Sequence, residues 1–129
     1  MQLPNDDGQI VSVGQGGQAL VLEFWSPTCA PCRRKLPELV ALAPRIEEHG
    51  AELVLVAVLN EGESVALARQ QLTRWGVQRS FLVDREGISQ QAAAIHALPA
   101  TLVLDAYHVV TWVAPPSATA EDVVAAIGR

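Results

Sequence analysis

Both cysteines of the chain lie in one short segment, Cys29-Ala30-Pro31-Cys32. An apolar run of strand length, 19–25, precedes this segment, and a helical pattern follows it. Cys29 therefore falls at a predicted helix N-terminus, where free N–H groups and a partial positive charge favour a thiolate. The thiolate is the form of cysteine that acts as a nucleophile.

The spacing of the two cysteines places Cys32 one turn further along the helix, within disulfide reach of Cys29. Such a pair can attack a substrate disulfide, pass through a mixed disulfide and close on itself. Two alternatives remain, namely buried cysteines without chemistry and half of a metal site, but a tetrahedral site needs two further ligands. His49, His96 and His108 are scattered, so we expect each at the surface or at a helix end.

The elements around the cysteines alternate between strands and helices. Buried strands are predicted over 19–25 and 52–59, and a helix over 30–49 that Pro37 and Pro44 interrupt. Further predicted elements are a helix over 65–75, a short strand over 80–83, a short helix over 89–97, a hairpin of strands 100–104 and 109–113, and a last helix that Thr119 caps. This order predicts a three-layer α/β fold with a mixed central sheet flanked by helices.

The composition indicates one domain, 1–129, with residues 1–18 as a loose N-terminal arm that holds one edge strand, 10–13. The chain has 129 residues, of which 50% are hydrophobic, and a net charge of −5. This charge argues against nucleic acid as a partner. The longest apolar run, 53–59, is far short of the ~20 residues that span a bilayer, and the acidic start of the chain does not resemble a signal peptide.

The segment Phe24-Trp25-Ser26-Pro27-Thr28-Cys29-Ala30-Pro31-Cys32 resembles the active site of thioredoxin-fold oxidoreductases, Trp-x-x-x-Cys-x-x-Cys. Pro37 matches the proline that kinks the following helix in that family, and Leu98-Pro99-Ala100-Thr101 resembles its cis-proline loop. The resemblance covers about residues 19–128. The segment 61–96 is longer than in plain thioredoxins and is similar to the TlpA/ResA/CcmG subgroup of periplasmic or membrane-anchored thiol-disulfide oxidoreductases.

The resemblance implies a role for each matching residue. Cys29 would be the attacking thiolate and Cys32 the resolving thiol, with Pro99 in a cis bond opposite them. Glu23 would be a buried acid beneath Cys32, where burial raises a carboxyl pKa and allows it to accept a proton near neutral pH. The alternative for Glu23 is a strand-end carboxylate that faces solvent. Residues that would contact substrate are Trp25, Pro27, Thr28, Pro31 and Leu98.

The implied activity is thiol-disulfide exchange with protein substrates and an upstream redox partner, by a monomer that needs no cofactor beyond its own disulfide. The Ala30-Pro31 spacer lacks the His of strong oxidants, which favours a reductant. The resemblance implies a periplasmic or membrane-anchored location outside the cytoplasm. The alternative is a cytoplasmic location, since the start of the chain does not resemble a signal peptide, but a mature or truncated chain would also lack that pattern.

Four sites depart from the family pattern, one of which is Asp105-Ala106-Tyr107-His108, where the usual glycine turn is absent. Members of the subgroup that act in cytochrome c maturation often have a Glu three residues after the second cysteine, whereas this chain has Lys35. Ala114-Pro115-Pro116 stands where the family commonly has a glycine, and Thr28 replaces the second Trp of plain thioredoxins. Lys35 argues against a specialised role in reducing apocytochrome c.

Three other functions share this fold. A peroxidase of the peroxiredoxin type requires Pro-x-x-x-Thr/Ser-x-x-Cys, but Pro27 and Thr28 directly precede Cys29. A copper chaperone uses Cys-x-x-x-Cys, which is one residue longer than the spacing here. A thioredoxin-like binding module without enzymatic activity does not require the intact cysteine pair.

Overall fold

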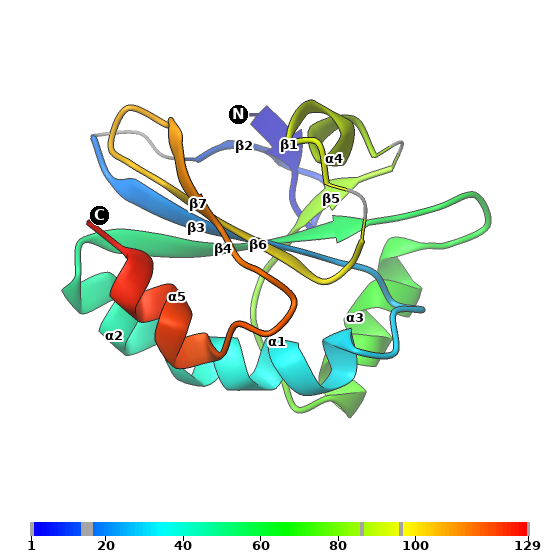
Figure 1. Cartoon of the computed structure of the whole chain (residues 1–129). Helices are drawn as coiled ribbons and strands as arrows, with labels where there is room; N and C mark the ends of the chain where they lie inside the picture. The colour runs from blue at the N-terminus through cyan, green and yellow to red at the C-terminus, as the bar shows by residue number, and fades with distance from the viewer. Residues whose placement is uncertain (1, 14–16, 86, 96, 129) are drawn as a thin grey trace.

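A five-stranded mixed sheet forms the centre of the computed structural model, which describes residues 2–13, 17–85, 87–95 and 97–128 (Figure 1). In spatial order its strands are β5 (Leu82–Asp84), β4 (Ala51–Val58), β3 (Ala19–Trp25), β6 (Ala100–Leu104) and β7 (Val110–Val113). Strands β3, β4 and β5 run parallel, whereas β6 pairs antiparallel with both β3 and β7. The predicted mixed sheet and the late hairpin are both confirmed.

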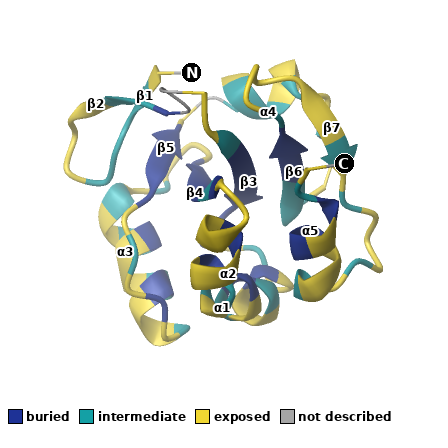
Figure 2. Ribbon diagram, turned by 90° about the vertical axis from the view of Figure 1, so that its left-hand side faces the viewer, coloured by how far each residue is buried: buried dark blue, intermediate teal, exposed yellow. Residues whose placement is uncertain are grey.

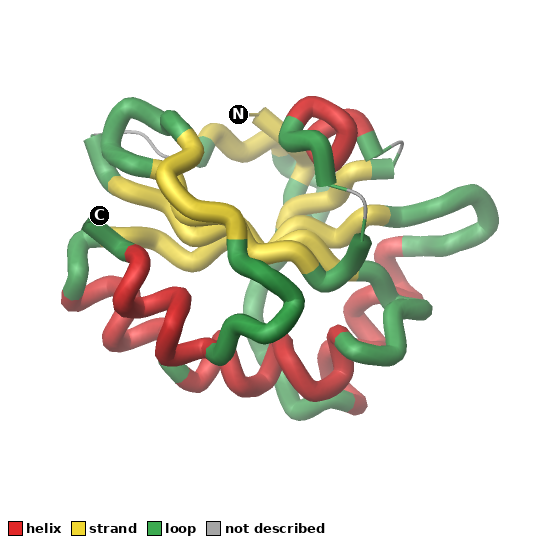
Figure 3. The backbone as a smooth tube through the Cα atoms, viewed as in Figure 1, coloured by secondary structure: helices red, strands yellow, loops and turns green. Residues whose placement is uncertain are grey.

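Helices cover both faces of the sheet, so the fold has the three layers that the sequence predicts (Figure 3). One face carries α1 (Cys32–Ala41), α2 (Ala43–Glu48), α3 (Val65–Arg74) and α5 (Ala120–Ala126). The other face carries the short helix α4 (Ile88–Ala92) and the N-terminal strands. Figure 2 shows that β3, β4 and β5 are buried almost throughout, whereas the edge strand β7 is largely exposed and α1, α3 and α5 are buried on their inner sides. None of the described helices is long and apolar enough to cross a membrane.

Alternate residues of β3 pack into the two halves of the core, because successive side chains of a strand point to opposite faces of the sheet. Leu20, Leu22 and Phe24 pack on the α4 side. Val21 and Trp25 pack on the opposite side with residues of α1, α3 and α5. Glu23 lies between Val21 and Trp25 in this alternation and is 2% exposed, so its carboxyl is enclosed on the α1 side of the sheet. The solvent-facing alternative for Glu23 is therefore wrong.

The predicted helix over 30–49 is divided into α1 and α2 at Leu42. Pro44 occupies the first turn of α2, where its missing N–H costs no helical hydrogen bond. Pro37 lies inside α1 without ending it. Gly50, with a φ of 82°, follows α2 and allows the sharp turn into β4. The proline rule thus predicts the break at Pro44 but not the continuity through Pro37.

The N-terminal segment contains two strands, β1 (Gln2–Pro4) and β2 (Ile10–Ser12), which pair antiparallel. We predicted the second strand and missed the first, because three residues that end in a proline carry no strand pattern. Asp6, in the turn between them, connects this hairpin to the main sheet. Its carboxylate accepts hydrogen bonds from Ser80 Oγ at 2.6 Å and from the N–H of Phe81 at 3.4 Å.

The remaining elements agree with the predicted ones to within two residues, except for α4. Helix α4 ends at Ala92 rather than near residue 97, and Ala94 just beyond it has a positive φ of 56°. The last helix begins after Thr119, as predicted, and Thr119 forms a reciprocal capping box with Asp122. In that box Thr119 Oγ1 accepts from the Asp122 N–H, and the Asp122 carboxylate accepts from the Thr119 N–H.

Candidate active site

Cys29 and Cys32 form a disulfide with a Cα–Cα distance of 5.4 Å. Cys32 is the first residue of α1 and has no exposed surface, whereas Cys29 precedes the helix and is partly exposed. The N–H of Cys32 donates to the carbonyl of Cys29 at 3.2 Å, so the segment forms a turn that leads into the helix. A partner molecule can therefore reach the sulfur of Cys29, while the sulfur of Cys32 stays beneath the surface.

The loop between β3 and the cysteines is held in place by hydrogen bonds. Ser26 Oγ accepts from the Thr28 N–H at 3.2 Å, and its carbonyl accepts from the Cys29 N–H at 3.2 Å. Gln71 of α3 donates to the carbonyl of Pro27 at 2.8 Å. Pro27 is buried and Thr28 is exposed, so only Thr28 of the two presents its side chain at the surface.

A second loop approaches the cysteines through Glu63, which the sequence analysis missed. The Glu63 carboxylate accepts from Thr28 Oγ1 at 2.9 Å and from the Asn60 N–H at 2.7 Å. This contact places a negative charge beside the residue that precedes Cys29. Thr28 and Glu63 are 35 residues apart in the sequence, and no motif joins them.

The Leu98–Pro99 peptide bond is cis, as the resemblance implied. The sheet register positions it, because Ala100 at the start of β6 pairs with Phe24 near the end of β3. Pro99 therefore lies at the edge of the sheet from which the chain leaves β3 toward Cys29. Leu98 and Pro99 are both partly exposed.

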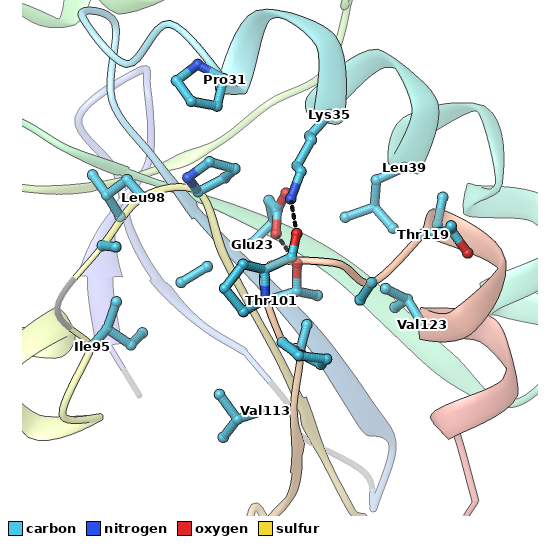
Figure 4. Close-up of a pocket in the computed structure, with 18 of the residues that line it drawn as sticks. Glu23, Pro31, Lys35, Leu39, Ile95, Leu98, Thr101, Val113, Thr119 and Val123 are labelled. Carbon is cyan, nitrogen blue, oxygen red and sulfur yellow. Dashed lines mark hydrogen bonds between the residues drawn. The ribbon is translucent and has the colours of Figure 1, made fainter.

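A cavity of about 530 Å³ extends from the cysteine turn to the sheet (Figure 4). Pro31 and Lys35 of the α1 side line it, as do the loop 97–101 and the segment 113–120. Most of its walls are apolar, and Glu23 reaches it from β3. The cavity brings together the cysteine turn, the cis-proline loop and the buried carboxyl, which lie far apart in the sequence.

The Glu23 carboxyl accepts a hydrogen bond from Thr101 Oγ1 of β6. Burial raises the pKa of Glu23 to about 8, against the opposing effects of the Thr101 hydrogen bond and the positive charge of Lys35. A carboxyl with this pKa exchanges a proton near neutral pH. We did not single out Thr101 from the sequence, although the antiparallel pairing of 19–25 with 100–104 would have placed it opposite Glu23.

The resemblance implied that Trp25 contacts substrate, but the structure places its side chain in the core. Its side chain has no exposed surface and makes edge-on contacts with Trp75 at 5.8 Å and Phe81 at 5.6 Å between ring centroids. Among the described residues none accepts a hydrogen bond from its Nε1. Trp25 therefore belongs to the hydrophobic core and does not form part of the surface beside Cys29.

The histidines lie apart from the cavity where the structure describes them. His49 at the end of α2 is exposed and its Nδ1 is 2.7 Å from the carbonyl of Arg45, and His108 is exposed in the turn before β7. Both agree with the prediction, and His96 lies outside the described residues. Within the described ranges, no group of three His, Cys, Asp or Glu side chains is arranged to hold a metal ion.

Comparison with known proteins gives one family and a set of relatives. The model of the AhpC/TSA family matches residues 1–113. The thiol-disulfide oxidoreductase ResA of Geobacillus thermodenitrificans is 28% identical over 107 residues, which are 83% of this chain and 60% of that protein. The sporulation thiol-disulfide oxidoreductase A of Bacillus subtilis is 21% identical over 99 residues, which are 77% of this chain and 60% of that protein.

Solved structures share the fold over nearly the whole chain. A thiol:disulfide interchange protein DsbE from Chlorobium tepidum superposes with a TM-score of 0.79 at 21% identity, and covers 99% of this chain and 93% of that one. StoA from Bacillus subtilis superposes with a TM-score of 0.77 at 19% identity, and the match covers 98% of this chain and 94% of StoA. The predicted thioredoxin-like fold is confirmed.

Proposed function

The chain belongs to the AhpC/TSA family, and we propose that it is a thiol-disulfide oxidoreductase that reduces protein disulfides through Cys29 and Cys32. The observation that carries this proposal is the asymmetry of the disulfide. Cys29 is partly exposed and Cys32 is buried, and Pro31 between them lines a cavity that Glu23, a carboxyl whose pKa burial raises to about 8, also lines. The relatives that are thiol-disulfide oxidoreductases support the same activity.

The reaction consists of two exchanges. The Cys29 thiolate attacks one sulfur of a substrate disulfide, and the other substrate sulfur leaves as a thiolate. Cys32 then loses its proton and attacks the sulfur of Cys29, which releases the second substrate thiolate and leaves the Cys29–Cys32 disulfide. Two electrons have passed from the protein to the substrate, and a dithiol partner must restore the reduced form.

Glu23 accepts the proton in the second exchange. Cys32 is fully buried and cannot pass its proton to bulk water directly. The Glu23 carboxyl lies on the side of β3 that packs beneath α1 and takes the proton directly or through one water. Thr101 holds the carboxyl in position through its hydrogen bond.

The partner surface is the exposed region around Cys29, formed by Thr28, Pro31 and the loop with Leu98 and Pro99. A cis-proline loop leaves neighbouring backbone groups free to pair with an extended substrate segment. The redox group is the disulfide itself, so the proposed reaction requires no bound cofactor. The upstream partner is a dithiol protein, and we propose that the chain acts as a monomer.

The experiment is reduction of insulin by dithiothreitol, followed by turbidity, together with consumption of hydrogen peroxide by the reduced protein. We expect faster insulin reduction by the wild-type protein and loss of this acceleration in Cys29→Ser. If Cys29→Ser keeps full activity, the proposal is wrong. Rapid peroxide consumption without insulin reduction would favour the peroxidase alternative.

A further inference from the structure

Lys35 is a positively charged residue that lines the same cavity as Glu23. It lies one turn after Cys32 on α1, and its side chain enters the cavity toward Glu23 and the segment 114–119 (Figure 4). Its Nζ donates a hydrogen bond to the carbonyl of Pro116 at 3.0 Å. The neighbouring cations on the same helix, Arg33 and Arg34, are exposed.

The segment 114–119 forms one wall of the cavity and is fixed at both ends. At its start the Ala114 N–H donates to the carbonyl of Thr101 at 2.9 Å. At its end the capping box of Thr119 begins α5. Between these points Pro115, Pro116 and Ser117 are exposed, and the hydrogen bond from Lys35 links this stretch to α1.

We propose that Lys35 is a positioning residue that couples the charge of Glu23 to the position of the 114–119 wall. When Glu23 carries a proton, the ammonium of Lys35 binds the Pro116 carbonyl and holds the wall against α1. When Glu23 is ionised, its carboxylate attracts the same ammonium and the link to Pro116 weakens. The inference deepens the proposed function, because Glu23 changes charge when it takes the proton of Cys32.

Two features of the site support this coupling. The positive charge of Lys35 already lowers the pKa of Glu23, so the two groups interact through the cavity. The structure, in which Cys29 and Cys32 form a disulfide, also matches the proposed state in which Glu23 is protonated. A Glu23 with a pKa of about 8 is mostly protonated at neutral pH, and Lys35 is found on Pro116.

The other groups that face Glu23 do not compete with Lys35 for this role. From α1 the cavity also receives Glu38, which is exposed, while Cys32 is in a disulfide and does not titrate. From β6 the neighbour is the uncharged Thr101, and from β4 it is Leu55. The cavity residues of the segment 113–120 and the described ones of 93–101 carry no charge. Lys35 is therefore the cation that responds to Glu23 among the described residues that line the cavity.

The test is a pH titration of the oxidised protein by NMR, in which neither cysteine titrates and no substrate is present. The ¹³C shift of the Glu23 carboxyl reports its protonation, and the amide shifts of Ser117 and Ala118 report the wall. In the wild-type protein we expect both sets of shifts to change with the same midpoint. Amides that do not change at the Glu23 midpoint would overturn the proposal.

Substitutions of Lys35 distinguish an effect of its charge on Glu23 and the 114–119 wall from an effect of its side-chain packing. In Lys35→Met, which keeps an apolar side chain of similar length, we expect a higher midpoint for Glu23 and no response of the wall at that midpoint. Lys35→Arg keeps the charge and should restore the response. Arg34→Met removes a neighbouring exposed cation and should change neither quantity. An unchanged Glu23 midpoint in Lys35→Met contradicts the proposal.

Glu23→Gln keeps the test decisive if Lys35→Met does not fold. A neutral amide cannot titrate, so the wall amides should then remain constant across the same pH range, and a persistent titration would exclude Glu23 as its source. None of these measurements uses catalysis. A failed insulin assay with intact coupling would therefore refute only the proposed function, and the reverse result would refute only the role of Lys35.

Discussion

Glu23 contributes to stability by an amount that depends on pH. Its pKa rises from 4.5 to about 8 on folding, because burial disfavours the charged form. Between these values the folded protein binds one more proton than the unfolded chain, so the free energy of unfolding falls as pH rises, by at most about 1.4 kcal/mol per pH unit. The contribution is complete below 4.5 and is lost above about 8.

We therefore expect that Glu23→Gln removes the decrease of the free energy of unfolding between pH 4.5 and about 8. Urea unfolding of the oxidised wild-type and variant proteins at several pH values measures this free energy. The variant should gain stability relative to the wild type as pH increases from acid to about 8. Glu38→Gln, the same change at an exposed carboxyl on the cavity rim, is the control and should keep the wild-type slope. Parallel pH curves for wild type and Glu23→Gln would show that Glu23 is not the group responsible.

The same substitution should also separate the two chemical steps. Reaction of the reduced protein with Ellman's reagent releases one chromophore when Cys29 attacks and a second when Cys32 resolves the mixed disulfide. Without the proton acceptor we expect the second step to slow by roughly 100-fold, while the first stays nearly unchanged. Equal rates of the second step in both proteins would remove Glu23 from the mechanism.

At the scale of single residues, the sequence predicted where Cys29, Cys32 and Glu23 lie better than it predicted their neighbours. Cys29 and Cys32 follow from residue type and from position relative to one strand and one helix, whereas the role of Glu23 came from the family resemblance. Thr101 contacts Glu23 because β6 pairs with β3, and Glu63 contacts Thr28 because the loop after β4 folds back. Such contacts depend on tertiary register, which a local pattern does not contain. Trp25 illustrates the same limit, because its motif position does not reveal that its ring is enclosed by Trp75 and Phe81.

At the scale of elements, the loop 60–64 is expected to influence Cys29 through Glu63. The Glu63 carboxylate is bonded to Thr28, and a negative charge beside a thiolate disfavours its formation. Glu63→Gln keeps an oxygen that can accept from Thr28 but removes the charge. We expect the pH midpoint for alkylation of Cys29 to move to lower pH.

Glu61→Gln is the matched control for this experiment. Glu61 lies in the same loop and is exposed, so the same change of net charge should have a smaller effect there. If both variants shift the midpoint equally, the effect is one of general surface charge and the Glu63–Thr28 contact has no special role.

Element boundaries were predictable where a backbone rule applies. Pro44, Gly50 and Thr119 mark helix ends for stereochemical or hydrogen-bonding reasons, and the ends lie beside them. Helix α4 is shorter than predicted, because the sequence pattern over 89–97 does not reveal the turn at Ala94, where φ is positive. The short β1 has no rule that would distinguish it from a loop.

At the scale of the whole molecule, Asp6 connects the N-terminal hairpin to the sheet. We expect Asp6→Ala to lower the free energy of unfolding by about 1–2 kcal/mol, because Ser80 Oγ and the Phe81 N–H lose their acceptor. Hydrogen exchange of the β1 and β2 amides should become faster. Asp7→Ala removes an adjacent, exposed carboxylate and should have little effect on either measurement.

The burial of Cys32 has a consequence for kinetics under the proposed function. Since only Cys29 reaches the surface, the electron donor and the electron acceptor must use the same sulfur in turn, and no complex can hold both at once. Turnover then follows a double-displacement scheme, in which double-reciprocal plots at different donor concentrations are parallel. A large excess of one partner occupies the shared sulfur and slows the other, so the ratio of the two partners, as well as their amounts, sets the rate.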